Sequence, residues 1–140
     1  MPTPPDTASG SRFKILVVED DSAALELLRE ILTFQGFDVL ALSQSEAAPD
    51  VIAQEALGAI FLDQQMPGLN GLDLCRQVRK SALNRTTPVV MITSSEDRKL
   101  MEGAFAAGVT LFLTKPIDRP RLLNLLKTVR GRMVARSGKP

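Results

Sequence analysis

The sequence contains no histidine and only one cysteine, Cys75, and these absences exclude whole classes of chemistry. Without histidine there is no His-based acid–base catalysis, no His metal ligand and no Ser-His or Cys-His triad. A single cysteine cannot form an intramolecular disulfide and disfavours a Cys-rich zinc site. We expect Cys75 to act as a small hydrophobic residue of a helix rather than as a redox switch. The chemistry must come from carboxylates, hydroxyls, lysine, arginine or this thiol.

The chain also lacks an excess of charge of either sign and any long apolar run. It carries 17 Lys and Arg against 16 Asp and Glu, a formal net charge of +1, which provides no electrostatic basis for direct nucleic-acid binding. No apolar run approaches the roughly 18 residues of a membrane span, and residues 1–11 do not resemble a secretory signal. We therefore expect no membrane association and a cytoplasmic location, in agreement with one unpaired cysteine.

What is present is a regular alternation of two kinds of segment. Short apolar runs rich in β-branched residues predict buried strands at 14–18, 37–42, 59–62, 88–92 and 109–113. Helical spacing predicts helices between them, at about 22–35, 47–54, 72–80, 96–106 and 118–133. This alternation predicts an α/β fold with a doubly wound, five-stranded parallel sheet in the order 2-1-3-4-5, flavodoxin-like, with helices on both faces.

Local signals predict where several of these helices begin and end. Asp21 or Ser22 can cap the first helix, and Gly36 suits its end. The hydroxyls of residues 93–95 can cap the helix from 96, which we expect to stop at Gly108. In the last helix the expected final turns carry three cations that complement the helix dipole. These cations are Lys127, Arg130 and Arg132.

A length of 140 residues fits one domain. We expect a flexible N-terminal tail over 1–12, the domain over 13–133 and a C-terminal tail over 134–140. About seven residues after Met133 are too few for a second core. A stand-alone protein and a fragment of a longer regulator both stay open.

Polar residues follow four of the five predicted strands. They are Glu19 and Asp20 after the first, Asp63 after the third, Thr93 and Ser94 after the fourth, and Lys115 after the fifth. In an open α/β sheet the binding crevice lies at the carboxyl ends of the strands, here between the first and third. We expect three carboxylates to converge there, beside a hydroxyl and an ammonium group.

Three carboxylates in one crevice repel one another, and burial makes their ionisation costlier still. A hard divalent cation suits such an all-oxygen site, and Mg²⁺ typically takes one or two carboxylates together with waters and a phosphate oxygen. Lys115 can neutralise part of the remaining charge. The set of residues therefore predicts a site for Mg²⁺, with Mn²⁺ as the alternative, and for a phosphoryl group.

Four motifs of this chain resemble those of the receiver domains of bacterial two-component response regulators. In chain order they are VVEDD at 17–21, FLDQQMPG at 61–68, PVVMITS at 88–94 and the Lys115-Pro116 pair. The resemblance covers about residues 13–133. One such motif alone would be weak, but four in order at the right spacing are highly specific.

The resemblance implies a phosphorelay function. Asp63 would be the nucleophile that accepts a phosphoryl group from a histidine kinase or a histidine phosphotransfer protein. Asp20 would coordinate Mg²⁺ directly, Glu19 through a water, and Gln65 through its backbone carbonyl. Such a protein is a signalling phosphoacceptor rather than an enzyme, because it catalyses only its own phosphorylation and dephosphorylation.

The resemblance also implies how the phosphoryl group is held and read. The Thr93 hydroxyl, the Ser94 N–H and the Lys115 ammonium would bind its oxygens, and the Lys115-Pro116 peptide bond would be cis. Thr93 and the aromatic Phe112 would act as the switch. The surface formed by helix 96–106, the fifth strand and the helix from 118 would then bind a downstream protein target. A weak homodimer through that face is a further expectation.

Three other functions compete with this interpretation. An aspartate-nucleophile phosphatase usually carries a second aspartate where this chain has Gln65. A flavin-binding module needs a Ser/Thr-rich phosphate loop where residues 19–21 are acidic and would repel a phosphate. A receiver-like scaffold that works by protein–protein contact without phosphorylation stays open as the alternative. The complete acidic set, with Thr93 and Lys115, argues against the scaffold.

Overall fold

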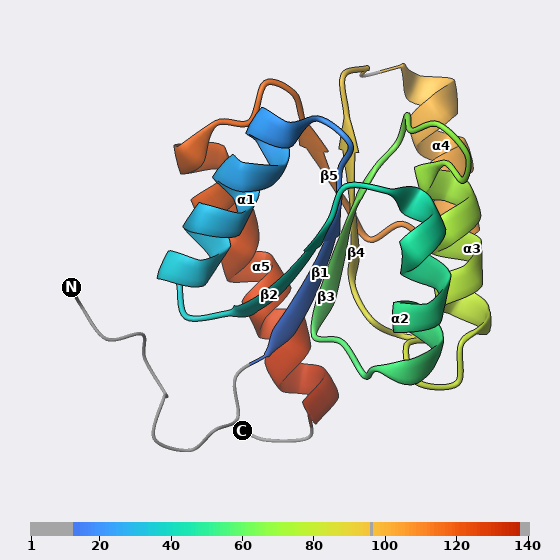
Figure 1. Ribbon diagram of the computed structural model, residues 1–140, viewed down its shortest axis with the longest axis horizontal. Coiled ribbons are helices and arrows are strands. Elements are labelled where there is room, and N and C mark those ends of the chain that lie inside the picture. The colour runs from blue at the N-terminus through green and yellow to red at the C-terminus, as the bar shows by residue number, and fades with distance from the viewer. Residues whose placement is uncertain (1–12, 96, 138–140) are drawn as a thin grey trace.

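The computed structural model describes residues 13–95 and 97–137. The predicted N-terminal tail 1–12, the predicted first residue of the fourth helix, Glu96, and residues 138–140 lie outside the described residues. Strands and helices alternate as the sequence predicts (Figure 1). The elements are β1 (Lys14–Val18), α1 (Ser22–Phe34), β2 (Asp38–Leu42), the short 3-10 helix η1 (Ser45–Ala47), α2 (Ala48–Gln54), β3 (Ala59–Asp63), α3 (Gly71–Lys80), β4 (Val89–Thr93), α4 (Arg98–Ala107), β5 (Leu111–Thr114) and α5 (Arg119–Ser137).

The five strands form one parallel sheet in the order β2-β1-β3-β4-β5, which confirms the predicted topology. Helices α1 and α5 cover one face, and α2, α3 and α4 cover the other (Figure 1). In the register of the sheet, Asp63 lies opposite Ile92, and Thr93 lies opposite Thr114. The strands therefore end at one common edge, which brings together residues that are far apart in the sequence.

Two hydrophobic cores hold these layers together, one on each face of the sheet. Successive side chains of a strand point to opposite faces, so Ile15 and Val17 pack toward α1 and α5, whereas Leu16 and Val18 pack toward the other helices. Cys75 is fully buried in the second core, as a small hydrophobic residue would be. Burial raises the pKa of its thiol, which fits an unreactive role.

The helix caps agree with the predictions for α1 and differ for α4. The Asp21 carboxylate accepts from the backbone N–H of Ala24 at 2.9 Å, and Gly36 follows the helix with a positive φ of 95°. Helix α4 ends at Gly108 as predicted, but it begins at Arg98. The predicted capping by the hydroxyls of residues 93–95 is wrong, because the carboxylate of Asp97 accepts from the first-turn N–H groups instead.

Helix α5 continues to Ser137, beyond the predicted end at Met133. Lys127, Arg130 and Arg132 therefore all lie before the last turn, which carries Arg136 instead, and their predicted interaction with the dipole of their own helix is wrong. Arg130 has a different role. Its guanidinium donates to the carbonyl of Gln35 at 3.1 Å and lies 4.5 Å from the ring centroid of Phe37. Because Gln35 is the C-cap residue of α1, the positive charge of Arg130 lies at the negative end of the dipole of that neighbouring helix. Among the helices described, none has both the length and the apolarity of a membrane span.

Candidate functional site

Five polar side chains predicted from the sequence lie at the carboxyl edge of the sheet. Glu19 and Asp20 follow β1, Asp63 ends β3, Thr93 ends β4, and Lys115 follows β5. One carboxylate oxygen from each of the three acidic residues lies within 4.8 Å of the other two. The fold thus creates one acidic cluster from three residues that two different strands deliver.

The backbone at the end of β1 decides which acidic side chain is buried. The N–H of Glu19 donates to the carbonyl of Leu42 at 3.0 Å, so Glu19 continues the pairing of β1 with β2. Its side chain consequently turns inward and is fully buried, whereas that of Asp20 is exposed. Asp21 turns away to cap α1, so the acidic run contributes two carboxylates to the cluster and the third to a helix.

Lys115 supplies the positive charge of the site. Its Nζ lies 3.1 Å from Asp63 Oδ2 and 3.2 Å from Glu19 Oε1. The backbone N–H of Lys115 donates to the carbonyl of Thr93 at 2.8 Å, so its backbone is fixed beside β4. The peptide bond from Lys115 to Pro116 is cis, as the resemblance implies. One ammonium group therefore faces two nearly buried carboxylates.

The electrostatics of the cluster favour a further cation. Burial, together with the neighbouring Asp63, raises the pKa of Glu19 to about 7, although the N–H of Asp21 and the ammonium of Lys115 act in the opposite direction. Burial lowers the pKa of Lys115, but the two carboxylates outweigh this effect and raise it overall. When all three carboxylates are ionised, one lysine leaves the cluster with excess negative charge.

The oxygen atoms of the cluster fit a hard dication. Glu19 Oε1 is buried and accepts no hydrogen bond from any residue that the structure describes, although Lys115 Nζ lies nearby. Buried carboxylate oxygens without a partner are costly unless a cation compensates them. Oxygen ligands from carboxylates are also those that Mg²⁺ prefers. Glu19, Asp20 and Asp63 could therefore hold such an ion together.

A glycine-dependent loop positions the segment after Asp63. Gly68 has a positive φ of 79°, and the hydroxyl of Ser45 donates to the carbonyl of Pro67 at 3.0 Å, so this turn is tied to η1. A Cβ atom at Gly71 would lie 2.5 Å from the carbonyl oxygen of Asp63, so only glycine lets α3 start this close to β3. The backbone N–H of Gln65 donates to Asp63 Oδ1 at 3.2 Å.

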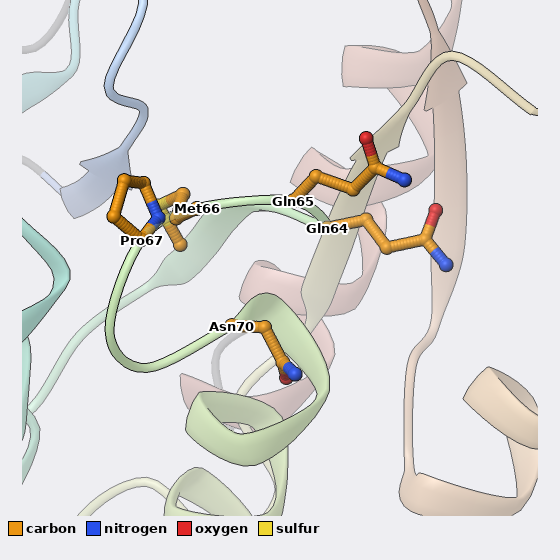
Figure 2. A pocket seen from close by; sticks show the side chains of 5 residues that line it. All are labelled: Gln64, Gln65, Met66, Pro67 and Asn70. Carbon is orange, nitrogen blue, oxygen red and sulfur yellow. The ribbon is translucent and has the colours of Figure 1, made fainter.

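A cavity of about 450 Å³ opens beside this loop and is shown in Figure 2. Its lining residues are Gln64, Gln65, Met66, Pro67 and Asn70. The side chains of Gln64 and Gln65 extend to the same side of the loop, away from Met66 and Pro67 (Figure 2). Two amide groups therefore lie on one side of the loop that directly follows Asp63 in the sequence.

The Thr93 hydroxyl lies at the edge of the cluster but is engaged elsewhere. It is hydrogen-bonded to the side-chain oxygen of Gln64 and accepts from the N–H of Ser95 at 3.1 Å. Ser94, a further predicted phosphoryl-binding residue, directly follows β4 and is exposed. Sequence reasoning assigned no role to Gln64, and its only signal there was its position next to Asp63.

Phe112, the predicted switch aromatic, lies half-buried in β5. Its ring meets that of Phe105 of α4 edge to face, with centroids 5.0 Å apart and an interplanar angle of 86°. Such an aromatic pair stabilises the fold beyond the contribution that comes from burying the apolar area of the two rings. Phe112 therefore connects the sheet edge near Lys115 with helix α4, whereas its part in switching stays a prediction.

Comparison with known proteins agrees with this geometry. Residues 15–127 match the model of the family described as "Response regulator receiver domain". The Response regulator MprA of Mycobacterium avium is 35% identical over 117 residues, which cover 84% of this chain and 50% of that protein. The Sensory/regulatory protein RpfC of Xanthomonas campestris is 33% identical over 116 residues, which cover 81% of this chain and 16% of that protein. The chain thus spans half or less of the length of these curated relatives.

A solved structure shows the same fold and a metal in the corresponding kind of domain. It is the receiver domain of the sensor histidine kinase PA1611 from Pseudomonas aeruginosa PAO1, with a magnesium ion coordinated in its active-site cleft. The two chains superpose with a TM-score of 0.78 at 25% sequence identity, over 86% of this chain and 99% of that one.

Proposed function

This chain belongs to the response regulator receiver domain family of two-component systems, and on that premise we propose that Asp63 accepts a phosphoryl group from a histidine kinase or a histidine phosphotransfer protein. Receiver domains of this kind are signalling phosphoacceptors and are not generally classed as enzymes. We propose that the domain, predicted over 13–133, extends to the end of α5 at Ser137 and works in the cytoplasm without direct contact to nucleic acid.

One observation carries this proposal. Asp63 is 3% exposed and lies within one acidic cluster with Glu19 and Asp20, while Lys115 Nζ lies 3.1 Å from its Oδ2. A carboxylate beside a cation and near further metal-ligating oxygens is what a phosphoryl acceptor requires, because the transferred group carries charge on three oxygens. Glu19 Oε1, which is buried and accepts no hydrogen bond from the described residues, supports a cation in the same place.

The metal would be Mg²⁺ or Mn²⁺. The carboxylates of Asp20 and Asp63 and the backbone carbonyl of Gln65 would hold the ion, with Glu19 acting through a water. When bound, the ion supplies charge neutralisation for the phosphoryl oxygens. The magnesium ion in the PA1611 receiver domain supports this assignment, and so does the oxygen-only set of ligands here.

The chain's own residues carry the transfer. An oxygen of the Asp63 carboxylate attacks the phosphorus in line, the bond from phosphorus to the donor nitrogen or oxygen breaks, and an acyl phosphate forms on Asp63. Lys115 neutralises one phosphoryl oxygen, the Thr93 hydroxyl donates to another, and the Ser94 N–H contributes a further hydrogen bond. Attack of water on the same phosphorus would reset the protein.

The output is a change in the surface that partners contact. Movement of the Thr93 hydroxyl toward the phosphoryl group would be coupled to Phe112 behind it, and Phe112 contacts Phe105 of α4. The face formed by α4, β5 and α5 would then bind a downstream protein, or a second copy weakly. Phosphorylation would thus bias two arrangements of one surface.

The direct test is phosphorylation of the purified protein by acetyl phosphate with Mg²⁺, followed by intact mass. We expect a gain of one phosphoryl group, and no gain in the presence of a metal chelator. Asp63→Asn should take up none, whereas Asp73→Asn, which changes an acidic residue of α3 outside the cluster, should be labelled like the parent. Labelling of Asp63→Asn at the parent's level would disprove the acceptor assignment. No labelling of the parent would favour the scaffold that acts without phosphorylation.

A further inference from the structure

Gln64 directly follows the proposed phosphoacceptor, yet its side chain engages Thr93. Its backbone is fixed on both sides, because its N–H donates to the carbonyl of Ile92 at 2.8 Å and its carbonyl accepts from the N–H of Gly71 at 3.3 Å. With the backbone held, the half-buried side chain extends to the side of the loop shown in Figure 2, where its amide oxygen meets the Thr93 hydroxyl. Gln64 thus joins the end of β3 to the end of β4 through side chains.

The Thr93 hydroxyl has only one proton to donate. The N–H of Ser95 donates to Thr93 Oγ1 at 3.1 Å and therefore occupies one of its lone pairs. The proton is left for the amide oxygen of Gln64 or for the carbonyl of Ser95, which lies 3.2 Å away. Thr93 is 3% exposed, so bulk water offers little competition. In this arrangement the hydroxyl has no proton to donate toward Asp63.

We propose that Gln64 is a positioning residue that holds Thr93 in the unphosphorylated arrangement, and that it thereby sets the fraction of molecules ready for phosphorylation. This inference rests on the proposed function, in which the same hydroxyl donates to a phosphoryl oxygen on Asp63. Binding of that oxygen and the contact with Gln64 compete for one proton, so they exclude each other. Removing the acceptor on Gln64 leaves the Thr93 proton only the longer contact with the Ser95 carbonyl at 3.2 Å. The cost of turning Thr93 toward Asp63 therefore falls, and the population shifts before any phosphoryl group arrives.

Gln64→Met tests this directly, because methionine has a similar length and cannot accept the proton in the same way. One neutral hydrogen bond corresponds to roughly a three- to tenfold change in such an equilibrium. We therefore expect Gln64→Met to be phosphorylated by acetyl phosphate about three to ten times faster than the parent. Gln77→Met, the same change on α3 outside the site, should keep the parent's rate.

A spectroscopic readout separates positioning from a merely structural role. In the unphosphorylated, metal-free protein, the NMR signals of the Thr93 methyl group and the Ser95 amide should move in Gln64→Met toward their positions in the phosphorylated parent. In a Thr93→Val background there is no hydroxyl to hold, so Gln64→Met should leave the Ser95 amide where Thr93→Val alone puts it. If Gln64→Met proves unstable, Gln64→Ala removes the same acceptor and is measured in its place.

The possible failures are distinguishable. If the parent is phosphorylated while Gln64→Met shows the parent's rate and the parent's Thr93 signal, the positioning role is overturned and the proposed function stands. The positioning role would also be overturned if Gln64→Met shifted the Ser95 amide signal equally in the parent and in Thr93→Val, because the effect would then not depend on the Thr93 hydroxyl. If the parent takes up no phosphoryl group, the proposed function fails and this inference fails with it.

Discussion

Neutralising Glu19 should stabilise the metal-free protein at pH 8 and should leave its stability almost unchanged near pH 4.5. The side chain of Glu19 is fully buried, and its Oε1 accepts no hydrogen bond from the residues described. Burial raises its pKa from 4.5 to about 7, with Asp63 acting in the same direction. Glu19→Gln keeps the shape of the side chain and removes the charge that the fold disfavours.

The sign and size follow from proton linkage. Between pH 4.5 and about 7 the unfolded chain has lost the Glu19 proton while the folded chain still holds it. The unfolded state binds fewer protons in this window, so the free energy of unfolding falls as pH rises and levels off above about pH 7. One pKa unit corresponds to about 1.4 kcal/mol, so the total loss is about 3 kcal/mol. Glu19→Gln has no carboxyl group to ionise at this position, so its free energy of unfolding does not fall in this way.

The assay is urea denaturation of the parent and of Glu19→Gln across this pH range with a chelator present. The groups facing Glu19, namely Asp20, Asp63 and Lys115, are shared by both proteins, so the difference between the two curves reports Glu19 together with its interactions with these groups. We expect that difference to grow in favour of the variant by about 3 kcal/mol from pH 4.5 to pH 8. Glu102→Gln, which changes an exposed carboxylate of α4, should run parallel to the parent.

The same denaturation experiment with added Mg²⁺ tests the effect of a bound cation. At pH 8 the ion should stabilise the parent, because a ligand that binds only the folded state raises the free energy of unfolding. Glu19→Gln should gain less, since it has one carboxylate fewer near the ion. Parallel curves for the parent and Glu19→Gln across pH, with equal gains from Mg²⁺, would refute the electrostatic account of the cluster.

Three further predictions concern the site and its support. Lys115→Ala should still bind Mg²⁺ in a titration but should lose at least about tenfold in phosphorylation-dependent binding of its target, because a charge-assisted hydrogen bond to the phosphoryl group is missing. An unchanged response would remove Lys115 from the mechanism. Gly71→Ala places a Cβ 2.5 Å from the Asp63 carbonyl oxygen and 2.7 Å from Met91 Sδ, so it should cost about 1–3 kcal/mol in denaturation and slow phosphorylation; a wild-type rate and stability would contradict this steric account. Asn84→Ala removes the partners of the Glu55 carbonyl and the Leu57 N–H, whereas the Ile52 carbonyl keeps the hydroxyl of Ser81, so it should lower the free energy of unfolding by at least about 2 kcal/mol. A loss below about 1 kcal/mol would show that water replaces the Asn84 amide.

Contacts that cross the sheet or join two helices escaped prediction from the sequence. The end of α4 at Gly108 follows from a local signal, and its start at Arg98 follows from the carboxylate of Asp97, which caps the helix in place of the hydroxyls of residues 93–95. For Arg130, by contrast, the sequence predicts an interaction with the dipole of its own helix. The structure shows instead that it contacts Gln35 and Phe37, which are more than 90 residues away in sequence. Such choices depend on neighbours that only the folded chain provides.

The sequence by itself determined the alternation of buried strands and amphipathic helices, and from it the order of the sheet and the edge at which Glu19, Asp63 and Lys115 meet. These features follow from periodicity and from the rule that parallel strands end together, which act on every residue of a segment at once. Only the tertiary structure decided that Glu19 is buried while Asp20 is exposed, and that Thr93 is held by Gln64. The reason is physical, because the direction of one side chain depends on a few atoms from distant segments, and no repeating pattern in the sequence records them.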